Sequence, residues 1–187
     1  MSNAASVAAA AAAALPPPRR RRLFAGVVPY GFDATNKLYL LLGREAGGRD
    51  AGCWSAFAGS PEFGQDEGDE VRTAAREAHE ESLGVLGSMD TLHFLLQSKA
   101  RVDTPTGTHF LLQLPYNSYM SITFDGVREA LGRAAAGRTH MRTFFEKDRM
   151  FWFAAADCVV PGLVRLRSGF GEDLPRIIAC IGTPATK

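Results

Sequence analysis

The stretch that decides the fold is Arg76-Glu77-Ala78-His79-Glu80-Glu81. Its three glutamates stand at positions i, i+3 and i+4, which share one face of an α-helix. Like charges at this spacing destabilise a helix by roughly a few tenths of a kcal/mol per pair, so we expect a compensating cation beside them. Hard cations such as Mg²⁺ take oxygen ligands from one or two carboxylates together with substrate phosphates. The spacing therefore predicts a metal-dependent phosphate site.

The residues around this stretch predict a strand, a loop and the helix that carries the glutamates. Residues 54–57 are predicted as a short strand leading to Gly59, and residues 60–68, rich in Gly, Pro and acidic residues, as a loop. The helix is predicted from Asp69, its N-cap, to Leu83, with Gly84 ending it. Its core face is narrow and consists of Val71, Ala75, Ala78 and Ser82.

The rest of the chain predicts further strands and helices. Strands are expected at residues 23–30, 37–42, 91–102, 109–114 and 150–154, with a loop at 43–48 and a hairpin turn at 103–107. A helix is expected over residues 125–136, and a partly helical segment over 162–181 with a break at Gly169 and Gly171. This order predicts an α+β (mixed α/β) fold in which helices cover a mixed sheet as an α/β/α sandwich.

Composition predicts one domain preceded by a tail. Residues 23–187 are long enough to bury a full core, whereas residues 1–22 form an Ala/Pro/Arg-rich stretch that we expect to be disordered. Four of the 21 basic residues lie in Arg19–Arg22, so the remainder has more acidic than basic residues and is not a nucleic-acid-binding surface by charge alone. The first 32 residues contain arginine and no acid, which leaves an organelle transit peptide as an alternative.

The three cysteines are far apart and odd in number, which argues against a disulfide framework or a zinc site and favours a cytoplasmic location. No apolar run is long enough to span a membrane, so we expect no membrane partner. The oligomeric state is not determined by the sequence.

Residues 54–59 and 76–81 together resemble the Nudix hydrolase family. Residues 76–81 match the core of the family signature, Arg-Glu-apolar-x-Glu-Glu-x-Gly-apolar, and residues 54–59 resemble the strand and glycine turn before it. Three departures stand out: an extra residue before Gly84, Ser60 where a second glycine is usual, and a longer loop over residues 61–68. The first signature glutamate has no match at the family spacing, which leaves Glu67, Asp69 and Glu70 as candidates.

The resemblance assigns roles to individual residues. It implies that Glu80 and Glu81 bind Mg²⁺ (or Mn²⁺), that Glu77 binds metal or deprotonates water, and that the Gly59 carbonyl is a further ligand. Arg76 would pair with a carboxylate and hold the helix in place. A further carboxylate is expected before the last strand, with Glu146 as first choice and Asp148 as second. Arg44 either holds a substrate phosphate or is a surface residue.

The resemblance also implies an activity. Water would attack one phosphorus of a nucleoside diphosphate linked to another group, which makes the protein a pyrophosphohydrolase with a nucleotide-type small-molecule substrate. A narrower alternative is mRNA decapping, in which capped RNA is cleaved to release m7GDP and the tail arginines hold RNA phosphates. The C-terminal residues 151–153 and 164–170 loosely resemble decapping-type Nudix proteins of large DNA viruses. A different class is a non-catalytic Nudix module that binds a nucleotide or a protein.

Overall fold

The computed structural model describes residues 24–66, 68–134 and 144–182. The strands are β1 (Ala25–Phe32), β2 (Leu38–Glu45), β3 (Trp54–Ser55), β4 (Phe57–Gly59), β5 (Arg101–Asp103), β6 (Thr108–Gln113) and β7 (Lys147–Ala154). The helices are α1 (Glu70–Glu81), α2 (Met89–Leu96), α3 (Tyr119–Ala134), α4 (Ala155–Cys158) and α5 (Ser168–Ile181). The tail of residues 1–22 and the candidate Glu67 lie outside the described residues.

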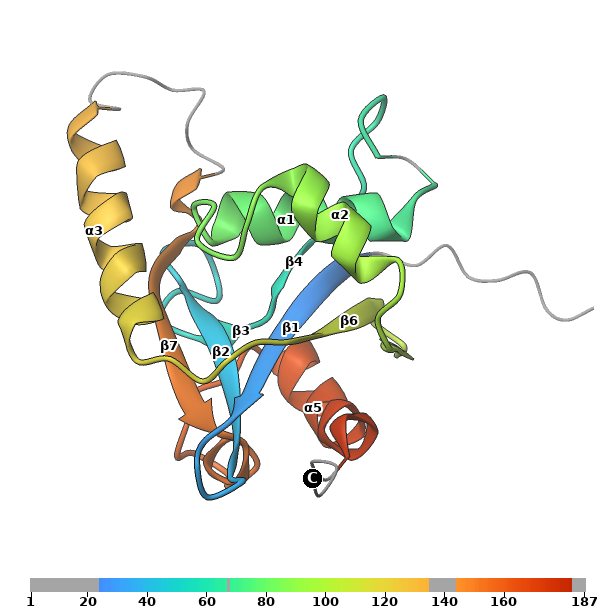
Figure 1. Ribbon diagram of the computed structural model, residues 1–187, viewed down its shortest axis with the longest axis vertical. Coiled ribbons are helices and arrows are strands. Elements are labelled where there is room, and N and C mark those ends of the chain that lie inside the picture. The colour runs from blue at the N-terminus through green and yellow to red at the C-terminus, as the bar shows by residue number, and fades with distance from the viewer. Residues whose placement is uncertain (1–23, 67, 135–143, 183–187) are drawn as a thin grey trace, which may run out of the picture.

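The strands of the described residues form one mixed sheet (Figure 1). Its main path runs β3-β2-β1-β6-β5, with β4 also paired to β1 and β7 to β2. β1 and β6 are parallel, and the remaining pairs are antiparallel. The connection from β4 to β5 passes through α1 and α2, which lie together on one side of the sheet in Figure 1.

Both faces of the sheet are buried, because neighbouring residues of its central strands point to opposite sides. Val27 of β1 and Leu41 of β2 pack in one core cluster with residues of α1, α2 and α3. Val28 of β1 and Leu40 of β2 pack in a second cluster with residues of α4 and α5. Helices therefore cover both faces, and the expected α+β sandwich with a mixed sheet is confirmed.

The helix that carries the glutamates lies where the sequence predicts it. The Asp69 side chain accepts the Arg72 N–H at 2.9 Å and so caps α1, as expected. On the expected core face Ala75, Ala78 and Ser82 are buried. The chain leaves the helix through two residues in the left-handed region, Leu83 and Gly84, and such a conformation favours glycine.

The strand predicted over residues 91–102 is wrong. Residues 89–96 form α2 instead, and only residues 101–103 pair as a strand. The Ser88 hydroxyl accepts the Thr91 N–H at 3.2 Å and caps the helix, while Leu92 and Leu96, four residues apart, are fully buried on one face. The cap and this spacing outweigh the strand propensity of the apolar residues.

Several other boundaries differ from the prediction, among them the start of β7, which begins at Lys147 and not at residue 150. β2 continues past residue 42 to Glu45 because β7 pairs with it from Tyr39 to Glu45, so Arg44 lies on a strand and not in a loop. α3 begins at Tyr119, earlier than expected, and the end expected at residue 136 lies outside the described residues. α5 is not interrupted at Gly169 and Gly171, because both glycines fall in its first turn. Among the described helices none is long and apolar enough to cross a membrane.

Candidate functional site

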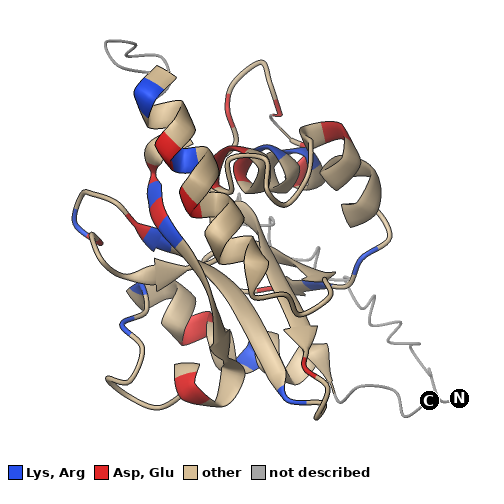
Figure 2. Cartoon of the chain, turned by 60° about the vertical axis from the view of Figure 1, so that its left-hand side comes forward, with Lys and Arg blue, Asp and Glu red and all other residues tan. Residues whose placement is uncertain are grey.

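The glutamate face of α1 packs against β4 and the residues that follow it. Glu77 is 8% exposed and its carboxylate lies against Gly59, where a Cβ atom would come within 2.1 Å of Glu77 Oε1. Only glycine at position 59 therefore allows the helix to approach this closely. Figure 2 shows charged residues on α1 and at the start of β7, whereas most of the sheet is uncharged.

Arg76 is the centre of this charged cluster and is itself buried. Its guanidinium contacts Asp66 at 2.7 Å, Glu77 at 2.8 Å and Glu80 at 3.2 Å, and it donates to the Ser60 carbonyl at 2.9 Å. Burial alone would lower the pKa of Arg76, but the hydrogen bond to Asp66 and the charges of Asp66, Glu77 and Glu80 outweigh it and raise this pKa. The guanidinium thus links the loop before α1 to Glu77 and Glu80, two of the three glutamates expected to bind metal.

Asp66, which the sequence analysis missed, is the loop carboxylate that pairs with Arg76. It is 3% exposed and also accepts the Glu62 N–H. Of the candidates for the first signature glutamate, Asp69 caps α1 and Glu70 pairs with Arg101 at 3.2 Å. The family spacing does not identify Asp66, because the longer loop changes the number of residues between the glycine turn and α1.

Glu81 has a different set of partners from Glu77 and Glu80. Its Oε2 accepts the Ala58 N–H at 2.8 Å, and its Oε1 lies 3.2 Å from Lys147 Nζ. Burial raises the pKa of Glu81 to about 8, while the Lys147 ammonium opposes this shift. Burial likewise raises the pKa of Glu77 to about 7, against the effect of Arg76 and with a further contribution from Glu80 and Glu146.

The donor set fits a hard divalent cation at Glu77 and Glu80. In the described part of the chain no three His, Cys, Asp or Glu side chains converge as ready metal ligands, because Glu77 and Glu80 point to Arg76 and Glu81 to Lys147. The donor atoms nonetheless suit Mg²⁺ or Mn²⁺, which prefer carboxylate oxygens. Burial raises the pKa of both Glu77 and Glu80, so a bound cation would stabilise their charged forms. Glu77 also lies against Gly59, whose carbonyl is the other expected ligand.

Glu146 and Asp148, the two candidates for the carboxylate before the last strand, have different surroundings. Glu146 is exposed just before β7, and its charge acts on Glu77. Asp148 instead accepts two hydrogen bonds from Arg44, at 2.7 Å from Nε and 3.0 Å from Nη2. The Arg44 guanidinium also lies 5.9 Å from the centre of the Trp54 ring. Glu146 is therefore the candidate whose charge acts on Glu77 of α1. The Arg44 guanidinium, by contrast, is paired with Asp148.

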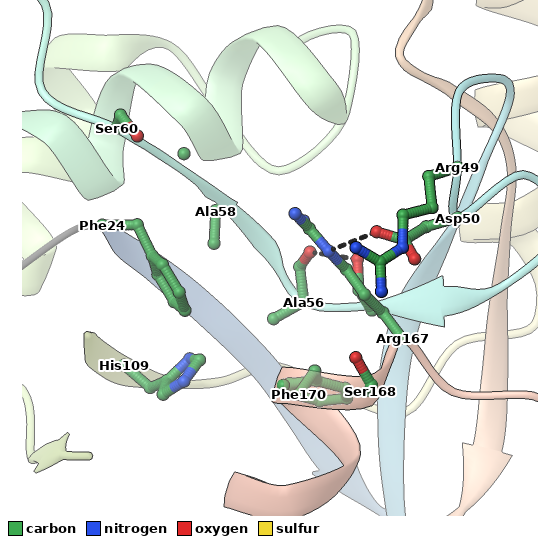
Figure 3. Close-up of a pocket in the computed structure, with 13 residues that line it drawn as sticks. Phe24, Arg49, Asp50, Ala56, Ala58, Ser60, His109, Arg167, Ser168 and Phe170 are labelled. Carbon is green, nitrogen blue, oxygen red and sulfur yellow. Dashed lines mark hydrogen bonds and ion pairs between the residues drawn. The ribbon is translucent and has the colours of Figure 1, made fainter. Parts of the chain in front are cut away.

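A cavity of about 290 Å³ opens beside Gly59 and Ser60 (Figure 3). Aromatic rings of Phe24, His109 and Phe170 line one part of it, and Arg49 and Arg167 line another. The ring centre of His109 lies 5.7 Å from that of Phe24 and 6.0 Å from that of Phe170. The cavity thus combines flat apolar surfaces with two guanidinium groups, and it is lined by Gly59, against which the Glu77 carboxylate lies.

His109 is a buried polar residue of the cavity wall. Its Nε2 lies 3.1 Å from Asp173 Oδ2, and its Nδ1 has no hydrogen-bond partner among the described residues. Burial lowers the pKa of His109, although Asp173 opposes the shift. If Nε2 carries the proton for Asp173, Nδ1 is a free acceptor. No spacing in the sequence pairs His109 with Asp173, because β6 and α5 are brought together only by the fold.

Comparison with known proteins gives the fold. No model of a protein family matches the sequence, and no curated protein matches it. The NUDIX domain of Shewanella oneidensis NrtR, solved with ADP ribose, is similar over 91% of this chain and 96% of its own, with 12% identity and a TM-score of 0.54. The Nudix hydrolase RenU of M. smegmatis covers 86% of this chain and 86% of its own, with 14% identity and a TM-score of 0.48.

A third structure, the Nudix hydrolase of Alicyclobacillus acidocaldarius, covers 85% of this chain and 91% of its own, with 16% identity and a TM-score of 0.47. The match to the NrtR domain shows that this chain has the Nudix fold. The resemblance found in residues 54–59 and 76–81 is therefore confirmed at the level of the fold.

Proposed function

We propose that the protein is a divalent-cation-dependent Nudix pyrophosphohydrolase that cleaves a nucleoside diphosphate linked to another group. The observation that carries this proposal is the contact of Glu77 with Gly59 and Arg76, next to a cavity lined by aromatic rings and arginines. The fold agrees with it, since the NrtR domain of the same fold was solved with ADP ribose.

Each residue of the site has a role in this reaction. Glu77, Glu80 and the Gly59 carbonyl would hold the Mg²⁺ or Mn²⁺ ion, with Glu146 as a further carboxylate at the edge. When bound, the ion supplies positive charge against the diphosphate. In the alternative role, Glu77 would accept a proton from the attacking water as a general base instead of binding the ion. Arg76 holds the carboxylates of Glu77 and Glu80 in place through its contacts at 2.8 Å and 3.2 Å.

The cavity supports a nucleoside as the recognised part of the substrate. A base between Phe24 and Phe170 would stack on flat apolar surfaces. Arg49 and Arg167 lie where they would attract a diphosphate, although Arg167 Nε is already 3.2 Å from Asp50. The diphosphate would then extend past Ser60 toward Glu77.

Capped RNA is the narrower alternative. Release of m7GDP from a capped transcript would use the same carboxylates and cavity, with Arg19–Arg22 of the tail, which lie outside the described residues, adding salt-dependent contacts to RNA phosphates. A non-catalytic module is the second alternative, and the altered spacing around residues 76–81 favours it. The presence of all three glutamates ranks it below the enzyme, because such a module usually loses an acid.

Product analysis on a mixed panel tests these proposals together. Capped RNA, ADP-ribose, a dinucleoside polyphosphate, NADH and nucleoside triphosphates are incubated with the wild type and Glu77→Gln in Mg²⁺ and in Mn²⁺. Glu77→Gln should lower kcat/KM by roughly 10²- to 10⁴-fold, because the amide cannot take a proton and binds the cation weakly. The matched control is Glu129→Gln, which removes an exposed carboxylate on α3 and should leave kcat/KM unchanged.

The outcomes separate the alternatives. Cleavage of one nucleotide derivative by the wild type alone supports the pyrophosphohydrolase, and m7GDP as the product selects decapping. Equal turnover by the wild type and Glu77→Gln would contradict the assigned site. No product with any substrate, combined with nucleotide binding, would replace the enzyme by the binding module.

A further inference from the structure

Lys147, the first residue of β7, is a buried cation that the sequence analysis passed over. Its side chain is 1% exposed, and a lysine is almost never buried this completely unless it is paired. Its Nζ lies 2.6 Å from Glu45 Oε1, 2.8 Å from Ser55 Oγ and 3.2 Å from Glu81 Oε1. The ammonium is thus surrounded by three oxygens that come from three different elements, β2, β3 and α1.

The sheet is built to admit the Lys147 side chain. Its stem passes over Gly43 of β2, where a Cβ atom would lie 2.9 Å from Lys147 Cγ and 3.0 Å from Cδ. An irregularity in the β2–β7 pairing between Arg44 and Glu45 places Glu45 opposite Lys147. Glycine at position 43 and this shift of register together bring the ammonium beneath the glutamate face of α1.

The charges around Nζ resemble those around a bound metal ion. Two carboxylates and a hydroxyl face one ammonium, and Ser55 Oγ itself donates to Glu45 at 2.7 Å. Arg167 Nη1 lies 3.8 Å from the same Glu45 oxygen, so a second cation from the cavity wall approaches the group. Without Lys147, Glu45 and Glu81 would be two largely buried carboxylates with little compensating charge, which is unfavourable.

We propose that the Lys147 ammonium is a built-in cation that takes the place of a metal ion at Glu81, so that divalent cations bind only on the Glu77 and Glu80 side of α1. The first half of this inference stands on the geometry of Nζ alone. The second half rests on the proposed function, because it concerns where the catalytic ion would sit.

Replacement of Lys147 by methionine tests the inference without any substrate. Methionine keeps the stem over Gly43 but ends one atom short of Nζ, which leaves room for an ion between Glu45 and Glu81. In EDTA, K147M should have a Tm lower than the wild type by about 10 °C, because two carboxylates lose their counterion. Addition of Mn²⁺ should recover most of this loss, and titration calorimetry should show about one more Mn²⁺ per chain than in the wild type.

Two further variants make the test decisive. Lys99→Met removes an exposed lysine of the α2–β5 connection and should change neither Tm nor the number of Mn²⁺ ions bound. The double variant E81Q/K147M removes the carboxylate together with the ammonium, so it should fold in EDTA and bind no more Mn²⁺ than the wild type. If K147M folds in neither buffer while E81Q/K147M folds in EDTA, Mn²⁺ does not replace the ammonium and the inference fails.

The outcomes distinguish this inference from the proposed function. If K147M binds no additional Mn²⁺ and its Tm loss persists in Mn²⁺, or if E81Q/K147M still binds the additional ion, Lys147 does not stand in for a metal at Glu81. If the wild type binds no Mn²⁺ at all while K147M gains an ion, the proposed metal site at Glu77 and Glu80 fails and the role of Lys147 is upheld.

Discussion

At the scale of single residues, His109 is the titrating group whose effect on stability can be isolated. Burial beside Phe24 and Phe170 lowers its folded-state pKa, so the unfolded chain binds a proton at this residue more readily than the folded one. Below about pH 6.5, the ordinary pKa of histidine, the unfolded state therefore carries more protons and the free energy of unfolding falls. The stabilising contribution is complete above this pH and is lost as the pH falls through the folded-state pKa.

Urea unfolding from pH 5 to pH 8 checks this expectation in the wild type and in His109→Gln. Glutamine does not titrate and still can donate a hydrogen bond to Asp173. The stability of the wild type relative to the variant should therefore decrease as the pH is lowered below about 6.5. Parallel pH profiles for the two proteins would mean that His109 takes up its proton equally well in the folded state.

Residue spacing identifies part of the candidate site and cannot identify the rest. Glu77, Glu80 and Glu81 are recognisable because helical periodicity puts them on one face. Asp66 and Lys147 are not, because their roles depend on contacts with residues 10 or more positions away, Arg76 and Glu45 respectively. A local pattern carries no information on which charged loop residue or strand residue the fold will bury.

At the scale of elements, the loop before α1 is fixed by a buried ion pair as well as by the helix cap. Asp66→Asn should lower the free energy of unfolding by about 3 kcal/mol, because it removes the carboxylate closest to the buried guanidinium of Arg76. This is the lower end of the range for broken buried pairs, since Arg76 keeps its contacts with Glu77 and Glu80. Chemical denaturation monitored by circular dichroism measures the change.

Asp69→Ala is the matched comparison, because it removes a partly exposed carboxylate three residues further along the same segment, one that caps α1 and lies 3.6 Å from His93 Nε2 but pairs with no buried arginine among the described residues. Loss of its hydrogen bond to the Arg72 N–H should cost about 1 kcal/mol. A larger loss in Asp69→Ala than in Asp66→Asn would show that the cap, and not the buried pair, holds the loop in place.

The sequence predicts an element well where its local signals agree with one another. The N-cap, the small-residue face and the glycine that ends the helix all indicate the same bounds for α1. The observed bounds therefore agree with the prediction to within about two residues. Residues 91–102 have a mixture of apolar residues that suits a strand or a helix, and the packing of Leu92 and Leu96 against the sheet decides for the helix. Short apolar runs stay ambiguous until their tertiary partners are known.

At the scale of the whole molecule, the sheet joins the two core clusters into one cooperative unit. β1 and β2 contribute alternate residues to each cluster, so neither helical layer can separate without exposing one face of the same strands. The glutamate face of α1 lies on one side of this unit, while Phe170 of α5 lines the cavity from the other. The proposed site is therefore assembled from both layers, and its geometry depends on both remaining docked.

We expect truncation in either layer to destabilise both layers equally. Leu92→Ala in α2 and Leu174→Ala in α5 should each lower the free energy of unfolding by about 2–5 kcal/mol, because each empties a buried site. Leu163→Ala, at a leucine that is 61% exposed, is the control and should change stability by less than about 0.5 kcal/mol.

The two tryptophans allow each layer to be followed separately. Trp152 belongs to the cluster under α1, α2 and α3, and Trp54 packs against the cluster with α4 and α5. In a Trp152→Phe background the fluorescence reports the second cluster, and in a Trp54→Phe background it reports the first. For Leu174→Ala, urea unfolding should give the same midpoint in both backgrounds after correction for the tryptophan substitution itself, because the shared strands transmit the loss. An earlier midpoint for Trp54 alone would show that the α5 layer unfolds independently, and the cavity would then open without disturbing Glu77 and Arg76.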